Sequence, residues 1–142
     1  MYRIRQCDIN DYPALVGIWE RSVRASHDFL GEDDICEIRA ALIPSYFPNV
    51  ALYGFVENGV IAGFIGLSGN MIEMLFVDDH SRGKGVGSAL INHAISLGAD
   101  SVDVNEQNPL ALDFYKSKGF RSVGRDELDS AGRPFPILHL AL

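Results

Sequence analysis

The sequence is poor in basic residues relative to acidic ones. Its 142 residues contain twelve Lys and Arg against nineteen Asp and Glu, which gives a formal net charge of −7. Nucleic-acid binding depends mainly on clustered basic side chains, so this composition argues against a nucleic-acid partner. An acidic surface suits a cationic partner better.

Cysteines and long apolar runs are also scarce. The two cysteines, Cys7 and Cys36, lack the paired spacing of a zinc site or of a disulfide framework, so we expect reduced thiols and no metal. Residues 1–7 alternate polar and apolar side chains, unlike a signal peptide, and no apolar stretch is long enough to span a bilayer. A cytoplasmic protein without a membrane partner is therefore expected.

The length and the apolar pattern predict one α/β domain that covers residues 1–142. The expected order is strand, two helices, three strands, helix, strand, helix and two strands. The expected strands are 1–7, 50–57, 60–68, 71–77, 101–104, 120–125 and 137–142. The expected helices are one that begins near Pro13, one from Asp33 to about Ile43 that Pro44 ends, one over 86–97 and one over 109–118.

The most specific local signal is the glycine-rich turn Arg82-Gly83-Lys84-Gly85-Val86-Gly87-Ser88, which lies between an expected strand and an amphipathic helix. The backbone N–H groups and the dipole at the start of that helix converge on any anion bound there. Glycines allow a phosphate to approach the main chain, and two cationic side chains flank it. These features together predict a pyrophosphate site.

Three known sequence patterns could explain a pyrophosphate site at this turn. A P-loop would need Ser or Thr directly after the lysine, where Gly85 stands, so that alternative is disfavoured. A dinucleotide-binding fingerprint would need its third glycine at Ser88, with Asp103 as the acidic residue, and this unit lies late in the chain. The third pattern, Arg/Gln-x-x-Gly-x-Gly/Ala, is met by Arg82, Gly85 and Gly87.

A second motif lies at the distance that this third pattern requires. Residues 104–120, VNEQNPLALDFYKSKGF, resemble the Asn-x-x-Asn-x-x-Ala-x-x-Phe-Tyr-x-x-x-Gly-Phe stretch of the GCN5-related N-acetyltransferase (GNAT) family. The two motifs and the expected order of elements make the chain similar to small bacterial GNAT domains over essentially its whole length. The resemblance implies a mixed, mostly antiparallel sheet of about seven strands flanked by four helices, with a splayed acetyl-CoA wedge between the fourth and fifth strands.

The resemblance also assigns the donor site for acetyl-CoA. The pantetheine arm would contact the main chain at Leu75, Phe76 and Val77, and a bulge in that strand would aim one N–H at the thioester carbonyl. The pyrophosphate would lie on Arg82, Gly83, Lys84, Gly85, Val86, Gly87 and Ser88. Asn105 and Asn108 would hold the pantetheine arm or begin the next helix, and a helix cap is an equally good interpretation of Asn108.

The resemblance implies direct attack by an amine, with Tyr115 as the proton donor to the departing thiolate. Without the family, Tyr115 would be interpreted as a core aromatic residue. An alkylamine with a pKa near 10 is mostly protonated in the cell, so a base has to accept its proton. Glu73 is the best-placed carboxylate by spacing, with His27 and Asp28 as competitors, and a solvated glutamate is the simpler interpretation of Glu73.

The acceptor side is expected at the loop that joins the first two helices. His27, Asp28 and Phe29 would line one wall, where acidic groups attract an amine and the aromatic ring covers its apolar part. The hairpin around Asp129–Arg133 would form the opposite wall. Polyamines, amino acids, aminoglycosides, peptide N-termini and protein lysines all remain open as acceptors.

Two other functions are alternatives to an enzyme. One is a binding module that holds acyl-CoA as a sensor or partner subunit without turning it over. The other is a nicotinamide-nucleotide binder, which depends on the glycines alone. Members of the family often form dimers, so a homodimer is a further expectation from the resemblance.

Overall fold

The computed structural model describes residues 2–27 and 29–142. The chain divides into two compact units, which we call the N-terminal unit (residues 1–99) and the C-terminal unit (residues 100–142), and each is described by itself. The α-helices and strands of the N-terminal unit are β1 (Tyr2–Gln6), α1 (Tyr12–Ser26), α2 (Glu32–Ala41), β2 (Ala51–Glu57), β3 (Val60–Ser68), β4 (Met71–Val77) and α3 (Val86–Ser96).

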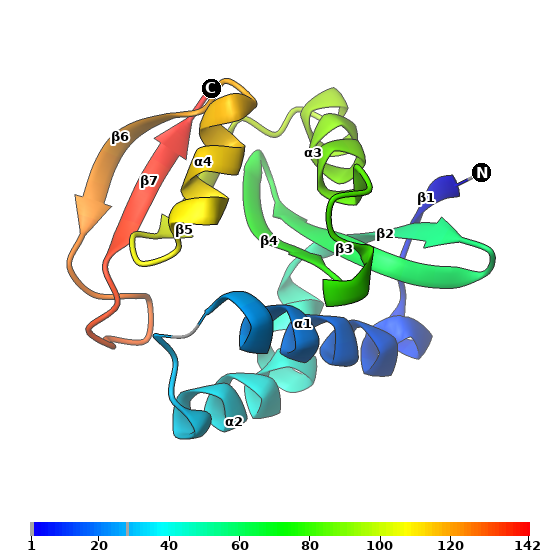
Figure 1. The fold of residues 1–142 in the computed structure, drawn as a ribbon, viewed down its shortest axis with the longest axis horizontal. Helices are drawn as coiled ribbons and strands as arrows, with labels where there is room; N and C mark the ends of the chain where they lie inside the picture. The colour runs from blue at the N-terminus through cyan, green and yellow to red at the C-terminus, as the bar shows by residue number, and fades with distance from the viewer. Residues whose placement is uncertain (1, 28) are drawn as a thin grey trace. The chain divides into compact units, whose positions relative to one another are not determined.

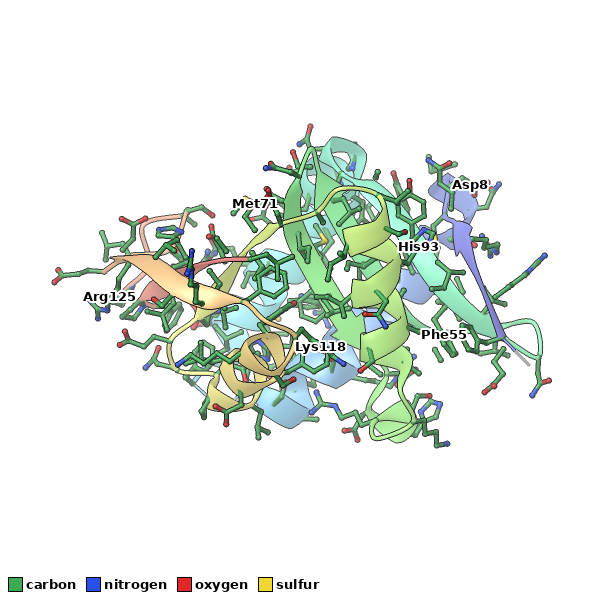
Figure 2. All side chains as sticks on the ribbon, turned by 90° about the horizontal axis from the view of Figure 1, so that it is seen from above. Asp8, Phe55, Met71, His93, Lys118 and Arg125 are labelled. Atoms are coloured by element: carbon green, nitrogen blue, oxygen red, sulfur yellow. The ribbon has the colours of Figure 1, made fainter. Side chains whose placement is uncertain are left out.

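The sheet of the N-terminal unit is antiparallel, in the order β1-β2-β3-β4. The turn between β2 and β3 is the Asn58-Gly59 pair, whose φ angles of 54° and 77° lie in the left-handed region that such a hairpin requires. Helices α1 and α2 cover one face of this sheet and α3 covers the other (Figure 1). Phe55 of β2 stacks on Tyr2 of β1 with 4.3 Å between ring centroids (Figure 2).

The core of the N-terminal unit lies between α1, α2 and the sheet. The apolar face of α1 forms its base, and Phe47 and Phe64 are fully buried in the same core with 5.9 Å between their rings. Full burial of each such ring contributes about 1.5–3 kcal/mol. Met74 and Phe76 of β4 pack against the same cluster, so the strand expected to contact the donor is held by the core.

The second helix differs from the prediction at both ends. It begins at Glu32 because Asp34 Oδ2 accepts the Gly31 N–H at 3.1 Å, which completes a cap one residue earlier. Pro44 was predicted to end the helix, and this is wrong in detail. Helix α2 ends at Ala41, and the chain continues through Pro44 in a π-helical turn, Leu42–Tyr46, in which the Phe47 N–H donates to Leu42 O and Pro44 does not have to donate to that carbonyl.

The C-terminal unit contains β5 (Ser101–Asn105), α4 (Pro109–Ser117), β6 (Arg121–Asp126) and β7 (Ile137–Ala141). Its strands pair antiparallel in the order β5-β7-β6. The register of β6 shifts between Ser122 and Gly124, and Val123 is the additional residue there. Helix α4 packs on β5 within this unit.

The described residues therefore form a mixed, mostly antiparallel α/β fold with seven strands and four α-helices, as the resemblance implied. The acetyl-CoA wedge between the fourth and fifth strands would join the two units and stays a prediction, as does the single domain over 1–142. Within the residues that the structure describes, no helix is long and apolar enough to cross a membrane.

Candidate active site

The glycine-rich turn places a row of backbone N–H groups at the start of α3. Gly83 and Gly85 have φ angles of 75° and 80°, and a Cβ at either position would meet nothing within 4 Å. The first bond inside the helix runs from Ala89 N–H to Gly85 O at 3.0 Å, so the N–H groups of residues 86–88 have no acceptor within the helix. This open main chain at a helix N-terminus has the geometry that a pyrophosphate needs.

The first turn of α3 is held closely against β3. Val86 is 3% exposed, and a Cβ added to Gly63 would lie 2.8 Å from Val86 Cγ1 and 3.0 Å from the Phe76 carbonyl oxygen. A glycine is therefore required at position 63 for the helix to approach the sheet. Val86 is buried against the sheet, whereas residues 82–85 are exposed to solvent. The turn is therefore packed at its helical end and accessible at the glycines.

The two cationic side chains of the turn lie in different environments. Lys84 is exposed. Arg82 extends toward α1, where its Nη2 lies 3.3 Å from Ser22 Oγ and 3.4 Å from the Ser22 carbonyl oxygen, and its Nε is 3.8 Å from Asp79 Oδ1. The structure thus ties one of the predicted anion ligands to α1.

An ion pair that the sequence did not reveal joins α1 to the residue after β4. Arg21 Nε and Nη2 donate to the two carboxylate oxygens of Asp78 at 2.9 and 2.8 Å. The Asp78 side chain is only 4% exposed, and the Arg21 guanidinium holds its pKa below the ordinary value against the opposing effect of burial. Asp78 O accepts the Ser81 N–H, so this carboxylate stands where the chain turns from β4 toward the glycines.

Strand β4 contains the bulge that the resemblance requires. Gly66 pairs with Met74 while Leu67 pairs with Ile72, so β4 advances two residues where β3 advances one. Glu73 is the additional residue, and it is exposed. Beyond the bulge, Leu75, Phe76 and Val77 pair regularly with β3 and are partly buried. The bulge changes the direction of the main-chain groups just before these three residues.

The acceptor loop meets β4 through aromatic rings. His27 follows the last residue of α1, and its ring centroid lies 5.4 Å from that of Phe29 and 6.4 Å from that of Phe76. His27 Nδ1 is 2.8 Å from Ser26 Oγ. Two of the three predicted acceptor residues therefore lie together beside the donor strand, whereas Asp28 lies outside the described residues.

The predicted residues of the C-terminal unit gather at the start of α4. Asn108 is buried and caps the helix, because its Oδ1 accepts the Ala111 N–H at 3.3 Å. Its own N–H donates to Asn105 O at 3.0 Å. The helix-cap interpretation of Asn108 is confirmed, and a further role toward the pantetheine arm stays a prediction.

Tyr115 is 6% exposed on α4, where its ring meets those of Phe114 and Phe120 edge to face at 5.4 and 5.7 Å. Burial raises the pKa of this phenol above its ordinary value near 10, so it is protonated at neutral pH. The ring of Tyr115 is therefore part of the core, as the interpretation without the family predicted. The hydroxyl remains available as a neutral hydrogen-bond donor.

The residues missed by sequence reasoning share one property. Arg21, Ser22 and Asp78 are ordinary polar residues in or beside amphipathic elements, and no motif singles them out. They matter because α1 and the turn after β4 pack together across 57 residues of sequence separation in the Arg21–Asp78 pair. Only the fold brings them to the site.

Comparison with known proteins gives consistent relatives. Residues 41–136 match the family model described as "Acetyltransferase (GNAT) domain". The chain is 42% identical over 140 residues to a protein named peptidyl-lysine N-acetyltransferase YjaB from Escherichia coli K12, across 97% of this chain and 95% of that protein.

Solved structures give the same fold. The solution structure of apo-form YjaB from Escherichia coli has a TM-score of 0.91 at 40% identity, covering 99% of this chain and 97% of that one. A PaiA N-acetyltransferase from Thermoplasma acidophilum, in complex with coenzyme A, has a TM-score of 0.77 at 18% identity and covers 100% of this chain and 99% of that one. The second likeness concerns the fold alone.

Proposed function

We propose that this chain, which belongs to the GNAT family and is an acetyl-CoA-dependent N-acetyltransferase, acetylates the ε-amines of protein lysines. The observation that carries the proposal is the 42% identity, over nearly the full length of both chains, to a protein named peptidyl-lysine N-acetyltransferase. The names of the curated relatives favour catalysis over the sensor alternative.

The donor half of the proposal assigns acetyl-CoA to the N-terminal unit. The N–H groups at the start of α3 and the cationic residues Arg82 and Lys84 would hold the pyrophosphate, and the main chain of residues 75–77 would align the pantetheine arm. Open space above Gly83 and Gly85 supports this fit, because a side chain at either position would occupy the approach to the main chain. The bulge at Glu73 supports a main-chain donor for the thioester oxygen.

The acceptor half rests on chemistry at the end of α1. A lysine side chain presents an amine on a long apolar stem, and the rings of Phe29 and Phe76, both close to His27, suit such a stem. The amine would attack the thioester carbon directly, in a complex that holds both substrates. The expected homodimer and the expected lack of a nucleic-acid partner and of a metal stay predictions.

Tyr115 would donate to the sulfur as the carbon–sulfur bond breaks. A free thiol has a pKa near 8.5, below that of a buried phenol by more than about 1.5 units, so complete proton transfer from Tyr115 is uphill. The hydroxyl therefore acts as a hydrogen-bond donor that stabilises the thiolate until a proton from the attacking nitrogen replaces its own. Asn105 and Asn108 would orient the start of its helix.

Mass spectrometry after reaction with ¹³C-acetyl-CoA tests the proposal. Three acceptors are compared: an N-terminally blocked peptide with one lysine, an unblocked peptide without lysine, and spermidine. We expect label on the lysine ε-amine, with kcat about 10²–10³-fold lower in Tyr115→Phe, because that variant keeps the ring and loses the donor.

Tyr53→Phe, which removes a phenol from β2, is the matched control and should retain the wild-type rate. Label confined to the peptide N-terminus or to spermidine would contradict the lysine assignment. A Tyr115→Phe variant as fast as Tyr53→Phe would contradict the role of Tyr115.

A further inference from the structure

The hydrogen bonds at the end of α1 determine where the protons lie. Ser26 Oγ is 2.8 Å from the Ser22 carbonyl oxygen and 2.8 Å from His27 Nδ1. A carbonyl oxygen has no proton to give, so the Ser26 hydroxyl donates its single proton to Ser22 O. Ser26 Oγ can then only accept from His27, which places a proton on Nδ1.

A neutral imidazole carries one proton, so this arrangement makes Nε2 the nitrogen with the lone pair. The tautomer is set by a third group, as it is in other sites where a base has to be aimed at a nucleophile. Ser22 O also accepts a hydrogen bond from Arg82 Nη2 at 3.4 Å. The carbonyl that accepts from Ser26 is therefore also bonded to the glycine-rich turn.

The position of the ring suits a proton acceptor for the amine. The His27 ring lies 5.4 Å from that of Phe29 and 6.4 Å from that of Phe76, and Phe76 belongs to the strand segment expected along the donor. The ordinary pKa of imidazole lies about 4 units below that of lysine, so His27 would accept the amine proton as attack on the thioester consumes the neutral amine. Arg24, in the last turn of α1, already binds Glu32 at 2.7 Å.

We propose that His27 is a catalytic residue that accepts the amine proton at Nε2, and that Ser26 is the positioning residue that fixes its tautomer. This inference rests on the proposed attack of an amine on acetyl-CoA. Glu73 is the weaker alternative, because it is exposed and the ordinary carboxylate pKa near 4.3 lies farther from that of an amine than an imidazole does.

Each turnover removes two protons from the amine nitrogen. The substrate enters as R–NH3⁺ and loses one proton to His27 Nε2, which passes it to solvent after turnover. As the carbon–nitrogen bond forms and the carbon–sulfur bond breaks, the nitrogen loses a second proton, which reaches the sulfur by way of the Tyr115 hydroxyl. The products are the amide, with one proton on nitrogen, the coenzyme thiol and one proton released.

The first experiment reads the tautomer directly and needs no activity. In the ¹⁵N-labelled protein at a pH where His27 is neutral, long-range ¹H–¹⁵N correlation should show a protonated Nδ1 and an unprotonated Nε2. Ser26→Ala should shift His27 toward the other tautomer, and Ser26→Thr, which retains a hydroxyl, should restore the wild-type pattern. A protonated Nε2 in the wild type, or no change in Ser26→Ala, would overturn the role of Ser26.

The second experiment separates catalysis from binding. We expect His27→Gln to lower kcat at least about 10²-fold and Ser26→Ala to lower it about tenfold, with the KM for acetyl-CoA unchanged in both. Ser26→Thr should return to within about threefold of the wild type. Ser96→Ala removes a matched serine, the last residue of α3, whose Oγ donates to His93 O, and should leave kcat unchanged.

The outcomes distinguish this inference from the proposed function. A His27→Gln variant with wild-type kcat would overturn the assignment of the base while leaving lysine acetylation intact. Failure of the wild type to acetylate any amine would overturn the proposed function, and the tautomer measurement would still decide the role of Ser26.

Discussion

A buried ion pair of the N-terminal unit and an exposed cluster of the C-terminal unit hold their charged side chains in contrasting ways. In the N-terminal unit, Arg21 binds an Asp78 carboxylate that is 4% exposed. In the C-terminal unit, His139 Nδ1 and Nε2 lie 2.6 and 2.8 Å from carboxylate oxygens of Asp103 and Asp126, on a strand face where these side chains are 35–69% exposed. Arg125 of β6 pairs with Glu106 in similarly open surroundings (Figure 2).

The buried pair fixes the positions of two elements, whereas the exposed pairs mainly respond to pH. A buried carboxylate that loses its partner has no water to replace it, so the Arg21–Asp78 pair holds α1 against the turn that leads to the glycines. Exposed pairs contribute little to stability because water and salt screen them, although their protonation changes with pH. The predictions below test this contrast.

The largest effect is expected at the buried pair. Arg21→Ala leaves the Asp78 carboxylate buried without its main partner and should lower the free energy of unfolding by about 2–4 kcal/mol. Asp78→Asn should cost less, because the Arg21 guanidinium, whose side chain is 55% exposed, can return to water. Urea denaturation of the two variants gives both values.

The control for the buried pair is Arg24→Ala on the same helix, where the guanidinium binds the partly exposed carboxylate of Glu20 and the exposed carboxylate of Glu32. It should change stability little. The pKa of Asp78 is lowered in the folded protein, so its contribution is present above its ordinary pKa and disappears as the pH falls through the lowered value. Equal losses in Arg21→Ala and Arg24→Ala would contradict the distinction between buried and exposed pairs.

An intermediate effect is expected at the glycine-rich turn. Gly85 and Gly59 have φ angles of 80° and 77°, and a Cβ at either position would meet no atom within 4 Å. Alanine at each should therefore cost a similar strain of about 1–2 kcal/mol. Only Gly85→Ala should also weaken acetyl-CoA binding, by about tenfold, because it obstructs and displaces the N–H groups at the start of α3.

Calorimetric titration and urea denaturation of both glycine variants separate the two effects. Equal weakening of acetyl-CoA binding in Gly59→Ala, which lies in the hairpin between β2 and β3, would mean that strain rather than local contact controls the affinity. Wild-type affinity in Gly85→Ala would argue against the anion site.

The smallest effect is expected at His139. The hydrogen bonds to Asp103 and then Asp126 raise its pKa above the ordinary value near 6.5. A raised pKa stabilises the fold fully below that ordinary value, and the gain is lost as the pH rises through the raised value. Between pH 6 and pH 9 the wild type should lose a measurable amount of stability relative to His139→Gln, below about 1 kcal/mol. Urea denaturation of both at the two pH values checks this, and parallel changes would contradict it.

Much of the fold was predictable because its signals are local. The hairpin turn at Asn58-Gly59, strands β3 and β4 to the residue, and the cap at Asn108 each depend on neighbours in sequence. The course of the chain through Pro44 was not predictable in this way, because a π-helical turn depends on how the segment packs rather than on the proline alone.

The candidate site divides along the same line. The residues that bind through the main chain, 75–77 and 82–88, follow from motifs and so were found in the sequence. Asp78 has a partner, Arg21, that only the tertiary structure supplies. The partners of Ser26 are local, but no motif indicates them, and the competition between Glu73 and His27 could not be decided from spacing. The exposure of Glu73 and the contact between His27 Nδ1 and Ser26 Oγ are the observations that lead us to propose His27 over Glu73.

The most direct test of the account is a calorimetric titration of the wild type with acetyl-CoA, with NADH and ATP as controls and Tyr115→Phe alongside. The account predicts saturable binding of acetyl-CoA alone, equally tight in Tyr115→Phe, because the glycine-rich turn binds the donor and the phenol acts only after it is bound. Absence of binding, or preference for NADH or ATP, would contradict the assignment of the turn as the acetyl-CoA site.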